Sequence, residues 1–358
     1  MVSTWRMRAC LVLGAAALLF IAGAGHAKTI KLTVVGAPPP IVTPVQVTKG
    51  YFVPEVDKRI AASGKDFKIE WTQAYSFTLA KFHEVLEAVE DGIADVGVQI
   101  HVFEESKLPL ENVSTYVPFG TADVHALTRI MRDVRIQVPE MDKVWSGYNQ
   151  VYLGTGVNDT IHLMTKFPVK RYEDLKGHKL GASGTMGNYL LNTGAVVVSS
   201  SMNQAYLHIK NGVYSGYPIS WGLGFAYKVY QSAPYLTKVN IGAIASTGLS
   251  VNVDSWKKLP GWVQTIFREV AVGWQDRHAA VSLGKSQKFE SIMVKAGAKV
   301  SDFPMEERRR WARVLPNVAQ QWADRLEKKG QPGQRVLEAY MQGLRDAKAE
   351  IVRDWDRE

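Results

Sequence analysis

Residues 79–100 read LAKFHEVLEAVEDGIADVGVQI, and this one stretch combines a helical pattern, a turn and a strand pattern. Its apolar residues before position 90 repeat at helical spacing, which predicts an amphipathic helix over Leu79–Glu90. Asp91-Gly92 ends that helix, and the apolar run Ala94–Ile100 is typical of a buried strand. A helix that leads through a tight turn into a buried strand is the repeating unit of an α/β fold.

The residues before this stretch extend the same alternation. Thr29–Val35 is rich in β-branched residues and predicts a first strand, which Gly36–Pro40 breaks. A helix over Thr48–Ser63 and a second strand over Phe67–Thr72 follow. This order predicts a parallel, doubly wound sheet. Ligands of such sheets sit beyond the carboxyl ends of the strands, so we expect the turn at 36–40 to face a cleft.

The alternation starts again at Lys179 and gives way to helix after Pro260. Three helical segments are predicted there, over 261–296, 305–328 and 332–350, and we interpret their tryptophans as packing residues. The predicted fold class is therefore α/β, with two lobes, hinge crossovers between them and long C-terminal helices. The predicted boundaries are 1–27 for a signal peptide, 28–155 mainly for lobe I, 156–255 mainly for lobe II, and 256–358 for a helical hinge and C-terminal region that packs on both lobes.

The first 27 residues are typical of a secretory signal. Arg6 and Arg8 precede a short apolar core, and Gly25-His26-Ala27 supplies small residues before a cleavage point at Lys28. The apolar core is too short for a comfortable membrane span, so we expect an exported protein without an anchor. The only cysteine, Cys10, lies in this segment, so the mature chain has no disulfide to stabilise it.

Composition excludes several classes of function. The formal net charge of +9 falls to +7 without the signal, and its lysines and arginines are scattered along predicted helices, which argues against a nucleic-acid partner. The eight histidines show no metal-ligand spacing, and no nucleophile elbow or phosphate-binding loop is present. We therefore expect no catalytic residue, no metal and no cofactor.

Several short motifs occur in a recognisable order. They are VLEAV at 85–89 with DGIADVG at 91–97, VPF at 117–119, FPV at 167–169, DLKG at 174–177, GVYSG at 212–216 and LSVNVDSW at 249–256. In this order the chain resembles the solute-binding proteins of tripartite ATP-independent periplasmic (TRAP) transporters, of the C4-dicarboxylate-receptor type. The resemblance implies a periplasmic location, two α/β lobes that close around a small organic acid, and a permease of two membrane subunits as partner.

The chain departs from that family at its polar anchors. The family's DLKG motif commonly continues to an arginine that clamps the ligand carboxylate, and Gly181 stands at that position here. The resemblance places a second basic residue at Ile161 and an asparagine near Ile219. Three polar anchors are therefore replaced by residues without a polar side chain.

Two explanations for this departure stay open. In the first, the backbone N–H groups of the loop Ser183–Asn188 bind a carboxylate without an arginine, and His162 adds a donor. In the second, Gly181 leaves open space in which aromatic side chains contact a more apolar ligand. We favour a combination, with a bulky or aromatic monocarboxylate as ligand in preference to a C4-dicarboxylate.

The candidate ligand-binding residues are drawn from both explanations. They are Tyr75, His101, Phe119, His162, Gly181, Ser183, Asn188, Tyr217 and Trp221. Structural alternatives remain for each kind of residue: core packing for Tyr217 and Trp221, helix capping for Ser183 and Asn188.

The function predicted from these observations is that of a periplasmic receptor which delivers a small organic acid to the TRAP membrane subunits. A ligand-sensing subunit that docks to a receptor kinase is the alternative. An exported hydrolase on the same scaffold would need a nucleophile–base pair, which the sequence does not offer. We expect a monomer or a weak dimer.

Overall fold

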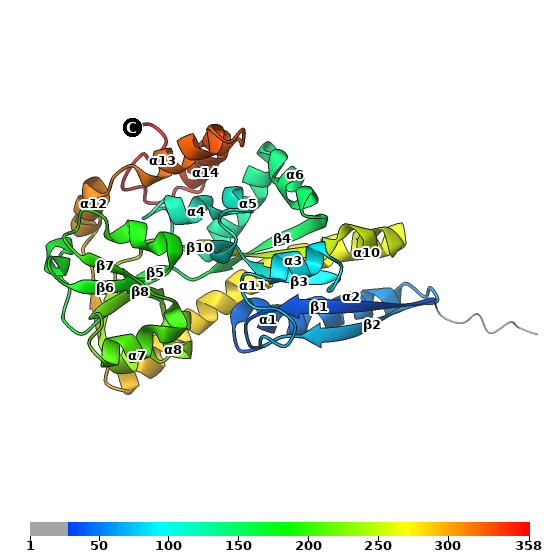
Figure 1. Ribbon diagram of the computed structural model, residues 1–358, viewed down its shortest axis with the longest axis horizontal. Coiled ribbons are helices and arrows are strands. Elements are labelled where there is room, and N and C mark those ends of the chain that lie inside the picture. Colours follow the sequence, from blue (N-terminus) through cyan, green and yellow to red (C-terminus); the bar gives the residue numbers. More distant parts are fainter. Residues whose placement is uncertain (1–27) are drawn as a thin grey trace, which may run out of the picture.

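The computed structural model describes residues 28–358, so the predicted signal peptide lies outside the described residues. The chain forms two α/β lobes, a long helix that runs through both, and a layer of helices above them (Figure 1). This arrangement confirms the predicted fold class. No helix among residues 28–358 is both long and apolar enough to cross a bilayer.

Lobe I is built on a five-stranded sheet in the order β2-β1-β3-β10-β4. Its strands are β1 (Lys28–Gly36), β2 (Phe67–Ala74), β3 (Val96–Ile100), β4 (Gln150–Asn158) and β10 (Ile244–Asn252). The first three pair in parallel, as predicted, whereas β10 runs antiparallel between β3 and β4. Its helices are α1 (Thr43–Val47), a π-helical turn at Thr48–Phe52, α2 (Val53–Ala62), α3 (Val85–Glu90) and α10 (Val253–Lys258).

Lobe II is built on a four-stranded sheet in the order β11-β9-β5-β8, with a separate parallel pair. The four strands are β5 (Ile161–Thr165), β8 (Gly216–Ser220), β9 (Tyr235–Lys238) and β11 (Lys299–Asp302), and the pair is β6 (Lys179–Ala182) with β7 (Val196–Ser199). Its helices are α7 (Ala205–Lys210), α8 (Trp221–Ala226) and α9 (Val229–Ser232), with 3-10 turns at Tyr172–Leu175, Gly184–Leu190 and Met202–Gln204.

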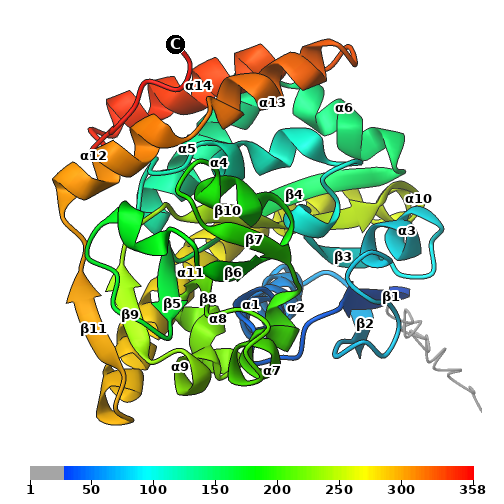
Figure 2. The ribbon, with the colours of Figure 1, turned by 60° about the vertical axis from the view of Figure 1, so that its left-hand side comes forward.

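The remaining helices cover and connect the lobes (Figure 2). They are α4 (Val113–Tyr116), α5 (Val124–Gln137), α6 (Glu140–Gly147), α12 (Met305–Val314), α13 (Val318–Glu327) and α14 (Gly333–Asp346). The long helix α11 (Gly261–Lys295) packs on α2 and β4 of lobe I and on α8 of lobe II. Its 35 residues span about 50 Å, enough to join both lobes. Trp274, Trp311 and Trp322 are buried in the core, which confirms their interpretation as packing residues.

Three elements differ from the sequence prediction. The helix predicted over 79–90 begins only at Val85, after a turn in which Glu84 accepts a hydrogen bond from the backbone of Lys81. The helix predicted over 305–328 divides at Pro316, because a proline cannot continue a helical hydrogen-bond ladder. Residues 299–302 form a strand because they pair with β9, far away in the sequence.

Candidate functional site

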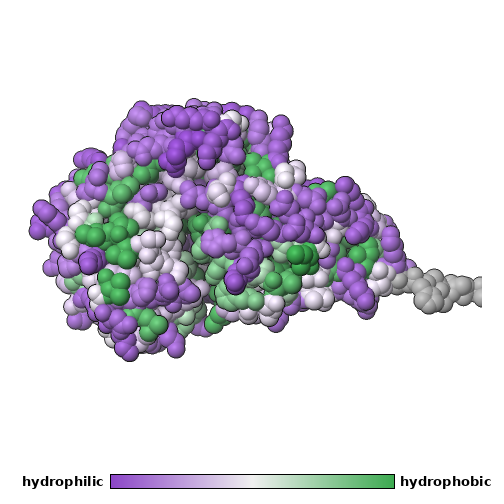
Figure 3. Space-filling model, viewed as in Figure 1, coloured by the Kyte–Doolittle hydropathy of each residue, from purple (hydrophilic) through white to green (hydrophobic). Residues whose placement is uncertain are grey.

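A cavity of about 280 Å³ lies between the two lobes, where the surface is hollowed in Figure 3. Lobe I contributes Pro38, Val42, Pro44, Phe82, His83, Ile100, Val102 and Phe103, and lobe II contributes Met186, Ser201, Met202, Asn203, Ser220, Leu223 and Tyr227. Strands that cross between the lobes supply Asn158, Ile161, Ile244 and Ser246. Pro38 confirms the expectation that the turn after the first strand faces a cleft.

The lining of this cavity is mainly apolar and carries no fixed charge. Aliphatic and aromatic side chains dominate it, and its polar groups are neutral hydroxyls and amides together with the imidazole of His83. No Lys, Arg, Asp or Glu lines it. Among residues 28–358 no group of His, Cys, Asp or Glu could hold a metal ion. Such a cavity can bury a largely apolar body and orient it through a few neutral hydrogen bonds.

An aromatic cluster forms the lobe I side of the cavity. The rings of Phe82 and Phe103 stack with centroids 4.6 Å apart. The ring of His83 lies edge-on to Phe103 at 5.1 Å, and its Nδ1 is 2.9 Å from the carbonyl oxygen of Phe103. These rings hold one another in place, so they present a preformed flat surface against which a ring or chain can pack.

Neutral polar groups lie where the strands cross between the lobes. Asn158 ends β4 and pairs in register with Ile244 of β10. The register then shifts between Ala245 and Thr247, so Ser246 is the extra residue of a bulge. Bulges re-aim side chains, and this one places Ser246 in the cavity wall.

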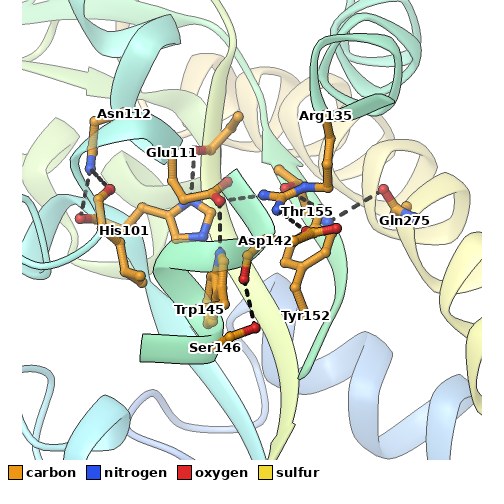
Figure 4. Close-up of polar contacts among 12 residues, drawn as sticks. His101, Glu111, Asn112, Arg135, Asp142, Trp145, Ser146, Tyr152, Thr155 and Gln275 are labelled. Carbon is orange, nitrogen blue, oxygen red and sulfur yellow. Dashed lines mark hydrogen bonds and ion pairs between the residues drawn. The ribbon is translucent and has the colours of Figure 1, made fainter. Parts of the chain in front are cut away.

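His101, whose sequence neighbours Ile100 and Val102 line the cavity, belongs to a buried polar cluster that includes Asn112 and Glu111 (Figure 4). His101 points away from the cavity, and its Nδ1 lies 3.1 Å from the carbonyl oxygen of Ala245. The amide of Asn112 donates to the carbonyl oxygen of His101 at 3.2 Å. His101 is not among the residues that line this cavity: β3 ends at Ile100, and in the 3-10 turn His101–Phe103 that follows, Val102 and Phe103 line the cavity while His101 is buried.

A buried ion pair lies at the centre of this cluster. Glu111 accepts hydrogen bonds from the guanidinium of Arg135 and, at 2.7 Å, from Nε1 of Trp145. Arg135 also pairs with Asp142 at 2.7 Å and lies 3.4 Å above the ring of Tyr152. Burial acts to raise the pKa of Glu111, but Arg135 outweighs it and the net pKa is lowered. The charged pair is thus stabilised inside lobe I.

None of the nine candidate residues is among those that line the cavity, so ligand contact by them stays a prediction. Tyr75 and Phe119 are buried in the core, and Phe119 lies edge-on to Trp311 at 5.9 Å. Asn188 lies in the same 3-10 turn as Met186, the residue of this loop that lines the cavity.

Four of the candidates form two pairs in lobe II. The hydroxyls of Ser183 and Tyr217 are 2.6 Å apart, and both donate to the carbonyl oxygen of Ser200. His162 stacks on Trp221 at 4.1 Å between centroids. The indole of Trp221 donates to Glu290 of α11 at 3.0 Å. Both pairs are buried: the first joins β8 to the end of the β6–β7 pair, and the second joins β5 to α8 and α11.

The prediction that Gly181 leaves open space is wrong. A Cβ atom at this position would lie only 2.5 Å from Cζ of Tyr214, whose ring fills the space. Tyr214 is itself held by a hydrogen bond between its hydroxyl and Ser200 at 3.0 Å. The ring of Tyr214 therefore occupies the space beside position 181, where the resemblance places the arginine.

Gly181→Ala is expected to destabilise the protein by about 1–3 kcal/mol, because the added methyl group collides with the ring of Tyr214. Urea denaturation would measure the loss. Gly187→Ala, in the neighbouring turn, is the matched control, since its Cβ would lie 3.4 Å from Val197. Equal stability of the two variants would contradict this account.

Most cavity residues were missed by the sequence prediction. Val102 and Phe103 directly follow the end of a predicted strand, which is a signal that could have identified them. Ser246, Leu223 and Met202 carry no such signal, because they reach the cavity only through a bulge or through the docking of one lobe on the other.

Stability is expected to fall as the pH drops below about 6.5, because His101, His162 and His278 are buried. Burial lowers all three pKa values, to about 3 for His162 and about 4 for His278. Below about pH 6.5 these histidines bind protons in the unfolded chain but stay neutral in the folded chain. Each of them therefore lowers the free energy of unfolding by up to about 1.4 kcal/mol per pH unit. Urea denaturation at pH 7.5, 5.5 and 4.5 measures this slope. His162→Gln should reduce it, and a flat profile in the wild type would refute the explanation.

The comparisons with known proteins agree with the two-lobed fold. The sequence profile described as bacterial extracellular solute-binding protein, family 7, matches residues 63–325. No curated protein is significantly similar to the chain. A TRAP periplasmic solute binding protein of Desulfovibrio salexigens has 20% identity and a TM-score of 0.79, over 90% of this chain and 97% of that one.

Two further structures share the fold. A Bordetella pertussis extracytoplasmic solute receptor that binds pyroglutamic acid has 18% identity and a TM-score of 0.74, over 87% of this chain and 99% of that one. A Shewanella oneidensis TRAP periplasmic solute binding protein with bound succinate has 17% identity and a TM-score of 0.71, over 88% of this chain and 99% of that one.

Proposed function

We propose a transport function for this chain, which belongs to bacterial extracellular solute-binding protein family 7, the TRAP solute-binding proteins. Proteins of this family are receptors of transporters and not enzymes. The proposed function is capture of a small organic acid in the periplasm and its delivery to the TRAP membrane subunits. The proposed ligand is a monocarboxylate with a bulky or aromatic body.

The observation that supports this ligand is the uncharged, apolar lining of the cavity between the lobes. Ile161 lines the cavity at a position where the resemblance places a basic residue. Tyr214 occupies the space beside Gly181, where the resemblance places the carboxylate clamp. No Lys or Arg lines the cavity, so a diacid would have to bury two negative charges there without a cation. A monoacid with an apolar body would bury only one.

The proposed mechanism is closure of the lobes around the solute. Residues from both lobes line the cavity, so a bound solute makes contacts in the closed form that it lacks in the open form. Those differential contacts shift the population toward closure. The crossings at β4–β5 and β9–β10, together with α11, are the segments about which the lobes would move. No feature of the described residues favours a receptor-kinase partner over the permease.

A thermal-shift screen of residues 28–358 tests this proposal. The library contains aromatic and short-chain monocarboxylates, C4-dicarboxylates and the neutral amides of the monocarboxylates. Binding to the folded state raises the melting temperature by mass action, and an aromatic monocarboxylate is expected to give the largest rise. Shifts with succinate-like diacids alone would overturn the proposed ligand class, and no shift with any carboxylate would overturn the proposed function.

A further inference from the structure

We infer that Lys285 of α11 is the cation that binds the carboxylate of the solute, which no motif in the sequence indicates. This inference rests on the proposed function, because it names the group that meets the acid in the same site. It also accounts for a carboxylate ligand in a family member whose clamp position is Gly181.

A small recess adjoins the main cavity at the hinge. Its volume is about 30 Å³, room for a water molecule or for the end of a carboxylate. Three residues line both spaces, so the recess is adjacent to the cavity. They are Val42, Asn158 and Leu223. Lys285 and Asp159 are its only charged lining residues.

Lys285 lines this recess, and the hydrogen bonds of its ammonium group within residues 28–358 go to neutral acceptors. Its Nζ donates to the carbonyl oxygen of Ile41 at 2.5 Å and to Oγ1 of Thr43 at 3.3 Å. Both acceptors are neutral and belong to the lobe I loop that lines the cavity, which leaves the third ammonium proton for a ligand. Among residues 28–358 no carboxylate forms an ion pair with this ammonium group. Lys285 is half-buried, its hydrogen bonds go to neutral acceptors, and Asp159 acts on it only electrostatically, so an incoming carboxylate can provide a direct charge-assisted partner.

Asn158 lines the same recess as the cation. Its side chain lines both spaces and makes no hydrogen bond within the described part of the chain. An amide and an ammonium can each donate to one oxygen of a carboxylate, as a guanidinium does alone. The apolar body of the solute would then lie in the main cavity, with its charged end at the hinge.

The charged surroundings of Lys285 fix the expected pH dependence. Burial lowers its pKa to about 8, while the carboxylate of Asp159 acts in the opposite direction. Asp159 is buried, with a raised pKa, and accepts a hydrogen bond from the backbone of Gly222 at 3.2 Å. His278, on the same helix, stays neutral because its pKa is lowered to about 4. A bound carboxylate would raise the pKa of Lys285, so acid affinity is constant below about pH 8 and falls as the pH rises above it.

The test uses matched acid and amide probes, phenylacetate with phenylacetamide and benzoate with benzamide. Titration calorimetry at pH 7 compares the wild type, Lys285→Met, Lys285→Gln and Lys288→Met. Lys285→Gln keeps a hydrogen-bond donor for Ile41, and the exposed Lys288 is the control on the same helix. We expect both Lys285 variants to bind the acids at least about tenfold more weakly, while amide affinity and the Lys288 variant stay unchanged.

The outcomes separate this inference from the proposed function. Acid binding that is equal in wild type and both Lys285 variants overturns the role of Lys285 and leaves the receptor function standing. Failure of the wild type to bind any acid of the wider screen overturns both. Net proton uptake on acid binding at pH 8.5, seen as a dependence on buffer ionisation enthalpy and lost in Lys285→Gln, supports the inference through a second readout.

Discussion

Arg135→Met is expected to lower the free energy of unfolding by about 3–5 kcal/mol, the largest stability effect that the structure predicts. The substitution leaves the carboxylate of Glu111 buried without its cation, and Glu111 is only 2% exposed. It also removes the cation above the ring of Tyr152. Because Glu111 lies beside His101 (Figure 4), and the next residues Val102 and Phe103 line the cavity, the loss should also loosen the cavity wall.

Urea denaturation at pH 7 measures this change, with Arg309→Met as the control. Arg309 is exposed and lies 3.9 Å from Glu306, so its removal should cost less than about 1 kcal/mol. The double variant Arg135→Met with Glu111→Leu should recover part of the loss, since it removes both charges. A loss below 1 kcal/mol for Arg135→Met would show that water reaches Glu111 and that the pair is not structurally important.

Ser246→Phe is expected to weaken solute binding by at least about 100-fold, or about 2.7 kcal/mol. The bulge in β10 directs this side chain into the cavity, so a phenylalanine ring would occupy the volume assigned to the body of the solute. The measurement is the affinity of the acid that gives the largest shift in the thermal screen. Circular dichroism and the melting temperature show whether the variant still folds.

Ser246→Ala is the matched control for the filled cavity. It removes the hydroxyl, whose nearest polar partner is Thr247 at 3.3 Å, but leaves the space open. Binding within about tenfold of the wild type is expected. Unchanged affinity of a folded Ser246→Phe protein would place the solute outside this cavity and withdraw the main support for the proposed ligand class.

The strands and helices of lobe I were largely predictable because their patterns are local. The alternation in Thr29–Val35 and the apolar run before Ile100 fix strands whatever they pair with. The strand at 299–302 was not predictable, since its mainly exposed sequence KVSD becomes a strand only beside β9. Long-range pairing also places β10 in the sheet of lobe I, although the strand before it in sequence, β9, lies in the sheet of lobe II.

The candidate site shows the same division. That the usual charged anchor is absent at Gly181 is visible in the sequence, but the ring of Tyr214 that fills its place is visible only in the fold. Lys285 lies more than a hundred residues from Asn158, and the two share a recess only because α11 packs against both lobes.

By itself, the sequence determined the periodic elements, the two-lobed α/β class and the loss of the charged clamp. Tertiary structure alone decided which side chains meet the solute. β3 ends at Ile100, and a 3-10 turn over His101–Phe103 then orients the next three side chains, but the sequence does not show which of them faces the other lobe. The docking of the lobes made that choice: Val102 lines the cavity, and His101 is buried behind it.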